Sequence, residues 1–154
     1  RSYQTFTTDN WLGGFYGSSG VLGTKSGGPM AAAWAVMNYL GDEGYLRLTE
    51  SARSTTRQLA QAIQSIDGLH LRAAPDSTLL SFGAQGFDVF AVADELALHG
   101  WYVDRQAPPD SLHCTVNAVH HQVIEEFIVD LSHAVTKVRD AGSSGSVGAY
   151  GTIE

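Results

Sequence analysis

Charged residues are scarce in this chain of 154 residues. They make up 16% of it, against roughly 25% in typical soluble domains, whereas hydrophobic residues make up 44%. The net charge is −7, and no basic cluster occurs that could neutralise the phosphates of a nucleic acid. The composition therefore argues against nucleic acid as a main partner. The scarcity of charge also predicts that part of the surface is buried against another domain or a second subunit.

Cysteine and long apolar runs are scarce as well. The one cysteine, Cys114, excludes an internal disulfide and is typical of a reducing, cytoplasmic setting. No apolar run approaches the roughly 20 residues needed to cross a bilayer, so we expect no membrane segment. The polar stretch from Arg1 to Asn10 does not look like a secretory signal. A first residue other than methionine leads us to expect a piece of a longer protein.

Metal-ligand spacing is also missing. His113, Cys114 and His120 come nearest to a ligand set, but alternation along a strand directs His113 and Cys114 to opposite faces. Cys114 would then lie on the apolar face, where a thiol is inert. We therefore expect neither a metal site nor a nucleophilic cysteine.

Glycine, in contrast, is abundant near the N-terminus. Seven of the 17 glycines lie between Gly13 and Gly28, a density that predicts an irregular loop over residues 1–28. Such a loop could turn backbone N–H groups toward an anion. It does not match a Walker P-loop, since Thr24 stands where that motif has glycine before Lys25. The residues alone leave open a ligand contact or a structural crossing. For Lys25 they leave open an anion contact, a Schiff-base nucleophile or a solvated side chain.

The rest of the chain predicts helices and short strands. Apolar spacing predicts a helix over 29–40 that ends at Gly41, and a long helix over 43–66 whose buried stripe includes Tyr45 and Leu48. Asp88 is a plausible cap for a helix over 89–98. Strands are expected at 69–71, 78–82, 101–103 and 112–116, and a last helix at 122–139. The fold class is therefore α/β (α+β): a small, mostly antiparallel sheet with helices on one face.

Several short motifs follow one another along nearly the whole chain. They are DNWLGGFYGSS from Asp9, GTKSGGP from Gly23, LGDEGY from Leu40, GFDVF from Gly86, PPDSLH from Pro108 and GAYG from Gly148. In this order they resemble the C-terminal half of the sphingosine-1-phosphate lyase family, which belongs to the group II pyridoxal-phosphate decarboxylases. The family often has arginine at the place of Lys25, and proline at the places of Ser19 and Ser26.

The resemblance implies the C-terminal portion of a fold-type-I enzyme that acts as a homodimer with pyridoxal 5'-phosphate. Such an enzyme would cleave a phosphorylated long-chain base into a fatty aldehyde and phosphoethanolamine, with the cofactor as electron sink. It also implies domain boundaries: residues 1–40 as the edge of the large domain, 41–66 as a linking helix, 67–140 as the small domain and 141–154 as a tail rich in Gly and Ser.

The resemblance further implies which residues face the site. In related dimers the glycine-rich loop reaches the neighbouring subunit's cofactor. The expected cofactor-binding residues are Gly17, Ser18 and Ser19, and the expected substrate-binding residues are Tyr16, Lys25, His113 and Tyr150. The family's Schiff-base lysine follows a histidine upstream of this loop, and this chain has no His-Lys pair and no lysine before Lys25. No catalytic residue is therefore assigned, and the chain alone is expected to be inactive.

Two other readings stay open at this point. The chain could be part of an amino-acid decarboxylase that shares the fold and cofactor but releases carbon dioxide. It could also be a non-catalytic α/β interaction module that only resembles the small domain of a lyase.

Overall fold

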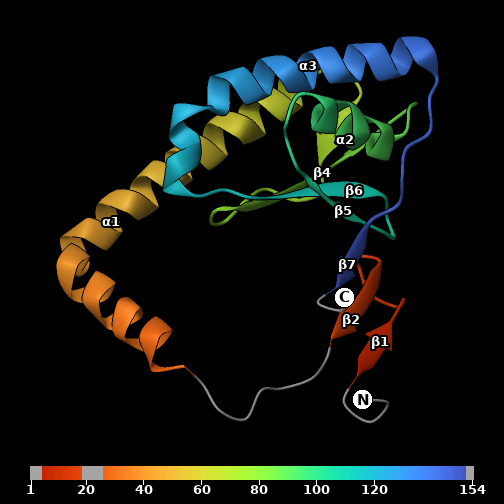
Figure 1. Cartoon of the computed structure of the whole chain (residues 1–154). Helices are drawn as coiled ribbons and strands as arrows, with labels where there is room; N and C mark the ends of the chain where they lie inside the picture. Colours follow the sequence, from red (N-terminus) through yellow and green to blue (C-terminus); the bar gives the residue numbers. More distant parts are fainter. Residues whose placement is uncertain (1–4, 19–25, 152–154) are drawn as a thin grey trace.

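Two sheets and three α-helices form the described part of the chain (Figure 1). The computed structural model describes residues 5–18 and 26–151, and for 149–151 it describes the backbone. In chain order the elements are β1 (Phe6–Thr8), β2 (Phe15–Ser18), α1 (Gly27–Ser65), β3 (Leu69–Leu71), β4 (Leu79–Ala84), α2 (Val89–Leu98), β5 (Asp104–Gln106), β6 (Ser111–Thr115), the 3-10 helix η1 (Ala118–Gln122), α3 (Ile124–Ala141) and β7 (Ala149–Gly151).

The larger sheet has the strand order β3-β4-β6-β5, and all its neighbouring strands are antiparallel. Helices α2 and α3 and the later part of α1 cover one face of it (Figure 1). Phe82 and Leu112 from the sheet are fully buried against Ile63, Leu96 and Leu131 from the helices. Alternation along β6 buries Leu112 and Val116 and leaves His113 on the outer face, as predicted. The predicted fold class is thus confirmed.

Helix α2 begins and ends where the sequence predicts. The Asp88 carboxylate accepts a hydrogen bond from the backbone N–H of Phe90 at 2.8 Å, which caps the first turn. Gly100 adopts a φ of 85° just after the helix, a conformation that few other residues tolerate.

Helix α1 differs from the two predicted helices at its start and in its buried face. It begins at Gly27, so that Pro29 lies in its first turn. Proline has no backbone N–H, and the helix tolerates it there because the N–H groups of the first turn have no intrahelical partner. The helical path is interrupted at Gly41, where φ is 57° and ψ is −176°, and Figure 1 shows the bend. Apart from Gly44, burial starts at Ala52, and the side chains of Tyr45 and Leu48 are 43% and 38% exposed. The predicted buried stripe is therefore wrong for its first turns, since no described element packs there.

The glycine-rich segment also differs from the prediction. β2 is the central strand of a second sheet, antiparallel to β1 and parallel to β7, so the expectation of an irregular loop is wrong for residues 6–8 and 15–18. Two neighbouring strands supply the ladder partners that offset the entropy cost of ordering Gly17. The tail from residue 141, which shows no periodicity, ends in the third strand of this sheet.

The strand predicted at 101–103 is wrong as well, because the ladder begins at Asp104. The apolar residues before it turn toward the helices instead. Val103 is buried in the core, and the indole N–H of Trp101 donates to Asp130 of α3 at 2.7 Å. Among the described residues, no helix combines the length and the hydropathy that crossing a membrane requires.

Candidate functional site

A groove of about 440 Å³ lies between the two sheets, where the segment between β1 and β2, the edge of the larger sheet and the tail meet. The first two are linked directly, since the N–H of Ala107 donates to the carbonyl of Leu12 at 2.7 Å. The groove is lined by Trp11, Gly13, Tyr102, Asp104, Arg105, Gln106, His113, Thr115, Val147 and Gly148. Three segments that are remote in sequence thus form one site.

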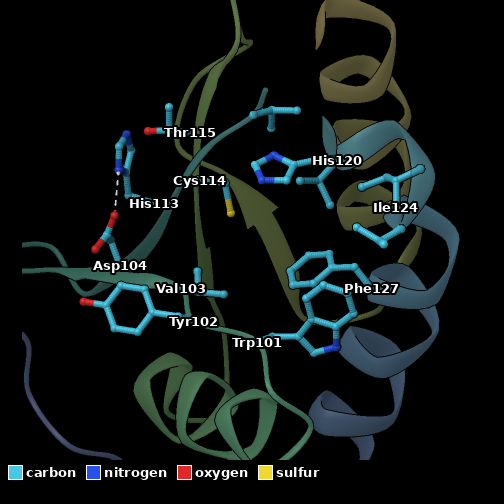
Figure 2. A pocket seen from close by; sticks show the side chains of 13 residues that line it. Trp101, Tyr102, Val103, Asp104, His113, Cys114, Thr115, His120, Ile124 and Phe127 are labelled. Carbon is cyan, nitrogen blue, oxygen red and sulfur yellow. Dashed lines mark ion pairs between the residues drawn. The ribbon is translucent and has the colours of Figure 1, made fainter. Parts of the chain in front are cut away.

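His113, an expected substrate-binding residue, lines this groove from the outer face of β6. It stands opposite Asp104 of β5, and its Nδ1 lies 4.0 Å from a carboxylate oxygen of that residue (Figure 2). An imidazole beside a carboxylate at a half-buried rim can bind a polar group or exchange a proton with it.

The other expected residues that the structure describes lie together on β2 and β7. The Tyr16 ring packs edge-on against the ring of Trp11, which lines the groove, with centroids 5.6 Å apart. Tyr16 pairs in register with Tyr150, and the buried Gly17 pairs with Thr7 and Gly151. Ser18 is the half-buried last residue of β2. Ser19 and Lys25 lie outside the described residues.

The central position of β2 bears on how this segment could hold a phosphate. A strand in the middle of a sheet directs its N–H and C=O groups at its two neighbours. The backbone at Gly17 therefore lies within the ladder, where it is not presented to an anion.

Arg105 of β5 is a groove residue that the sequence analysis missed. Its guanidinium lies 2.5 Å from the Asp94 carboxylate of α2, and its side chain is 15% exposed. Asp94 also accepts hydrogen bonds from the N–H of Ser146, at 2.7 Å, and from its hydroxyl. Burial alone would raise the pKa of Asp94, but these hydrogen bonds and the charge of Arg105 hold it below its usual value. A lone arginine in a short polar strand carries no motif, so no sequence signal could have found it.

The tail is fastened along the same side. The N–H of Gly145 donates to the second oxygen of the Asp88 carboxylate at 2.9 Å, next to the first turn of α2. A side chain at Gly148 would place its Cβ 2.9 Å from the Cβ of Arg105, so glycine allows the tail to lie flat on β5. Asp88, which caps α2, and Asp94 within the helix thereby guide the tail toward β7 and the groove.

A second, smaller pocket of about 220 Å³ opens beside the groove (Figure 2). Cys114 points its sulfur into this pocket, and burial, with a contribution from Asp104, raises the pKa of the thiol to about 12. The thiol therefore stays protonated at neutral pH. In the described part of the chain, no group of three or more metal-ligating side chains comes together.

The described residues do not by themselves fit pyridoxal phosphate, which needs a lysine within reach. Of the two lysines, Lys25 lies outside the described part, and Lys137 of α3 pairs with Glu95 of α2 at 2.6 Å, away from the groove. Among the described residues, the groove therefore offers no lysine that could hold the cofactor.

Comparison with known proteins relates the chain to one enzyme family. No protein-family model matches it. The sphingosine-1-phosphate lyase of Arabidopsis thaliana is 33% identical over 139 residues, which cover 90% of this chain and 26% of that protein. The lyase of Drosophila melanogaster is 32% identical over 159 residues, which cover 100% of this chain and 29% of that protein. The chain thus spans between a quarter and a third of the length of these curated relatives.

Solved structures give the same result. The sphingosine-1-phosphate lyase of Burkholderia pseudomallei K96243 superposes with a TM-score of 0.72 and 36% identity, covering 92% of this chain and 32% of that one. A cysteine desulfurase of Escherichia coli superposes with a TM-score of 0.62 over 89% of this chain, but at 17% identity it shows the fold alone.

Proposed function

Because the chain belongs to the sphingosine-1-phosphate lyase family and matches a C-terminal portion of it, we propose that it forms one wall of the active site of a pyridoxal-phosphate-dependent lyase. The observation that carries this proposal is the match to the Burkholderia lyase over 92% of the chain. The groove supports it, since the expected residue His113 and the segment before β2 line the same space.

The proposed reaction cleaves a carbon–carbon bond in a phosphorylated long-chain base and yields a fatty aldehyde and phosphoethanolamine. Pyridoxal phosphate, when bound, supplies the electron sink for this chemistry. The residues of this chain bind and orient. In this proposal Ser18 and Ser19 contact the cofactor phosphate, and the imidazole of His113 meets a polar group of the substrate.

The domain boundaries proposed from the sequence are compatible with this arrangement. The bend at Gly41 falls at the proposed border between the large-domain edge and the linking helix, and the core lies between residues 59 and 138. We further propose a homodimer in the cytoplasm, in which the segment around β2 contributes to the neighbouring subunit's cofactor site.

The reaction is tested on the chain expressed together with the sequence that precedes Arg1. We expect it to release fatty aldehyde and phosphoethanolamine from a phosphorylated sphingoid base, and no carbon dioxide from free amino acids. Release of carbon dioxide would instead identify an amino-acid decarboxylase. Absence of both activities together with absence of cofactor binding would identify a non-catalytic module.

The isolated chain tests whether the cofactor lysine lies elsewhere. We expect the 154 residues, mixed with pyridoxal phosphate, to develop no stoichiometric visible absorption band. A band that borohydride fixes covalently onto Lys25 would overturn the view that this chain is inactive alone.

Replacing Lys25 by methionine tests the proposed contact with the substrate phosphate. Loss of the point charge is expected to raise the KM for the phosphorylated base at least tenfold and to change kcat less. The matched control is Lys137→Met, which removes the lysine paired with Glu95 outside the groove. Equal KM values for the two variants would rule out the phosphate contact.

A further inference from the structure

The edge of the larger sheet has an opening next to the groove. β5 pairs with only the first three residues of β6, Ser111 to His113. The pairing stops there because Asp104, which stands opposite His113, is the first residue of β5. β6 continues to Thr115, while the chain before Asp104 turns away toward α3. The edge of β6 at Cys114 and Thr115 therefore borders an opening that leads behind the sheet.

The space behind this opening is the smaller pocket, and its inner walls are apolar. Leu59 of α1, Val116 after β6, and Ile124 and Phe127 of α3 line it together with Val103. The Trp101 ring meets the Phe127 ring edge-on, with centroids 5.3 Å apart, and its N–H is already bonded to Asp130. The rings are therefore held in place, and the pocket keeps its shape without an occupant.

The polar atoms at this pocket are either neutral or turned outward. The Cys114 thiol is protonated at neutral pH, and the Nδ1 of His120 accepts a hydrogen bond from the N–H of Asn117 at 3.0 Å. His113 and Tyr102 point away from the pocket toward the groove side (Figure 2). A charged ligand group would lose its hydration in this pocket without gaining a partner, which costs free energy. Burying a hydrocarbon there is favourable, because it removes apolar surface from water.

The pocket and the groove adjoin each other along the edge formed by β5 and β6. They share four lining residues: Tyr102, Asp104, His113 and Thr115. The groove side carries a carboxylate, a guanidinium and an imidazole, and the pocket side is hydrocarbon. A ligand that spans both must be amphiphilic, with a charged head and an apolar chain.

We propose that the apolar pocket behind Cys114 and Thr115 receives the alkyl chain of the substrate while its charged head lies in the groove. This rests on the proposed function for the identity of the substrate, but the binding itself needs no cofactor. The pocket would then select for chain length. Each methylene that it buries is worth roughly a fourfold gain in affinity, until the pocket is filled.

Calorimetry with a series of alkyl phosphates tests the proposal on the 154-residue chain. From butyl to octyl phosphate, below their micelle concentrations, we expect the Kd to fall roughly fourfold per methylene and then to level off. Val123→Phe fills the rim of the pocket and is expected to abolish the dependence on chain length. The matched control, Val129→Phe, lies on the exposed face of α3 and is expected to leave it unchanged. A Kd that is independent of chain length in the unaltered chain would overturn the proposal.

A second measurement needs no variant that could fail to fold. Because Cys114 is the one cysteine of the chain, its alkylation by a thiol-selective maleimide, followed by mass spectrometry of the Cys114 peptide, reports on this pocket. Octyl phosphate is expected to slow the alkylation at least tenfold and butyl phosphate to leave its rate unchanged. Equal alkylation rates with octyl and butyl phosphate would overturn the proposed alkyl-chain site, even if the protein cleaves the phosphorylated base. Protection by octyl phosphate in a protein without lyase activity would overturn the proposed function and support the pocket.

Discussion

The Asp94 carboxylate connects three parts of the chain that are far apart in sequence. It holds the guanidinium of Arg105 at the groove, and it accepts hydrogen bonds from both the backbone and the hydroxyl of Ser146 in the tail. Its position on α2 fixes where these two segments lie relative to the core. The geometry of the groove thus depends on a side chain that does not line it.

Replacing Asp94 by asparagine should lower the free energy of unfolding at pH 7 by about 1 kcal/mol, a low value for charged hydrogen bonds because the carboxylate is 39% exposed. The pKa of Asp94 lies below its usual value in the folded chain, so this stabilisation is present above about pH 4 and disappears as the pH falls through the folded pKa. Denaturant titrations from pH 7 to pH 2 measure the difference. The control is Asp76→Asn in an exposed loop, and a gap between the unaltered chain and Asp94→Asn that persists at pH 2 would contradict the assignment.

At the scale of elements, the sequence predicts well where the signals are local. Helix α2 is defined by its own cap at Asp88 and by the glycine after it, so both ends are correct. β2 could not be found in this way, since its neighbour β7 lies at the other end of the chain. The strand at 101–103 is wrong because burial of Val103 outweighed its β-propensity. The same holds for the residues of the groove. His113 could be predicted from a local motif, whereas the position of Arg105 depends on its ion pair with Asp94 of α2.

Gly41 tests whether the bend in α1 depends on glycine. Its φ of 57° with a ψ of −176° is a conformation in which a side chain is strained, so Gly41→Ala should destabilise the bent form by roughly 1–3 kcal/mol. Gly28→Ala is the matched control, because a Cβ there meets only Ser26 at 3.7 Å and alanine favours the helix. Hydrogen exchange of the amides of residues 30–40 measures the effect. Faster exchange is expected in Gly41→Ala only, and equal exchange in both variants would show that the bend does not need glycine.

At the scale of the whole molecule, the first part of α1 is the most conspicuous surface. It stands away from both sheets (Figure 1), and its side chains at Met30, Trp34 and Met37 are 61%, 66% and 53% exposed. Apolar surface of this extent is typical of an interface. The low content of charged residues, noted from the sequence alone, has its structural counterpart here. A second copy of the chain, or another domain, would cover this face.

Trp34→Glu should therefore weaken self-association of the chain by tenfold or more, since a charge would be buried at the centre of the contact. Sedimentation velocity over a range of concentrations measures it. Leu98→Glu is the matched control, because Leu98 of α2 is 76% exposed and distant in sequence from this face. If both variants associate like the unaltered chain, α1 is not the contact between copies.

The parallel pairing of β2 with β7 also sets an order of events during synthesis. Residues 15–18 leave the ribosome before the core elements, and β7 emerges only after them. The contact has a very long loop to close, and such contacts form late. We therefore expect α2, α3 and the larger sheet to assemble while the segment around Gly17 waits, still without its second neighbour. The early part of this chain is completed by the last, so translation that stops short of residue 149 would leave a folded core beside an unfinished groove.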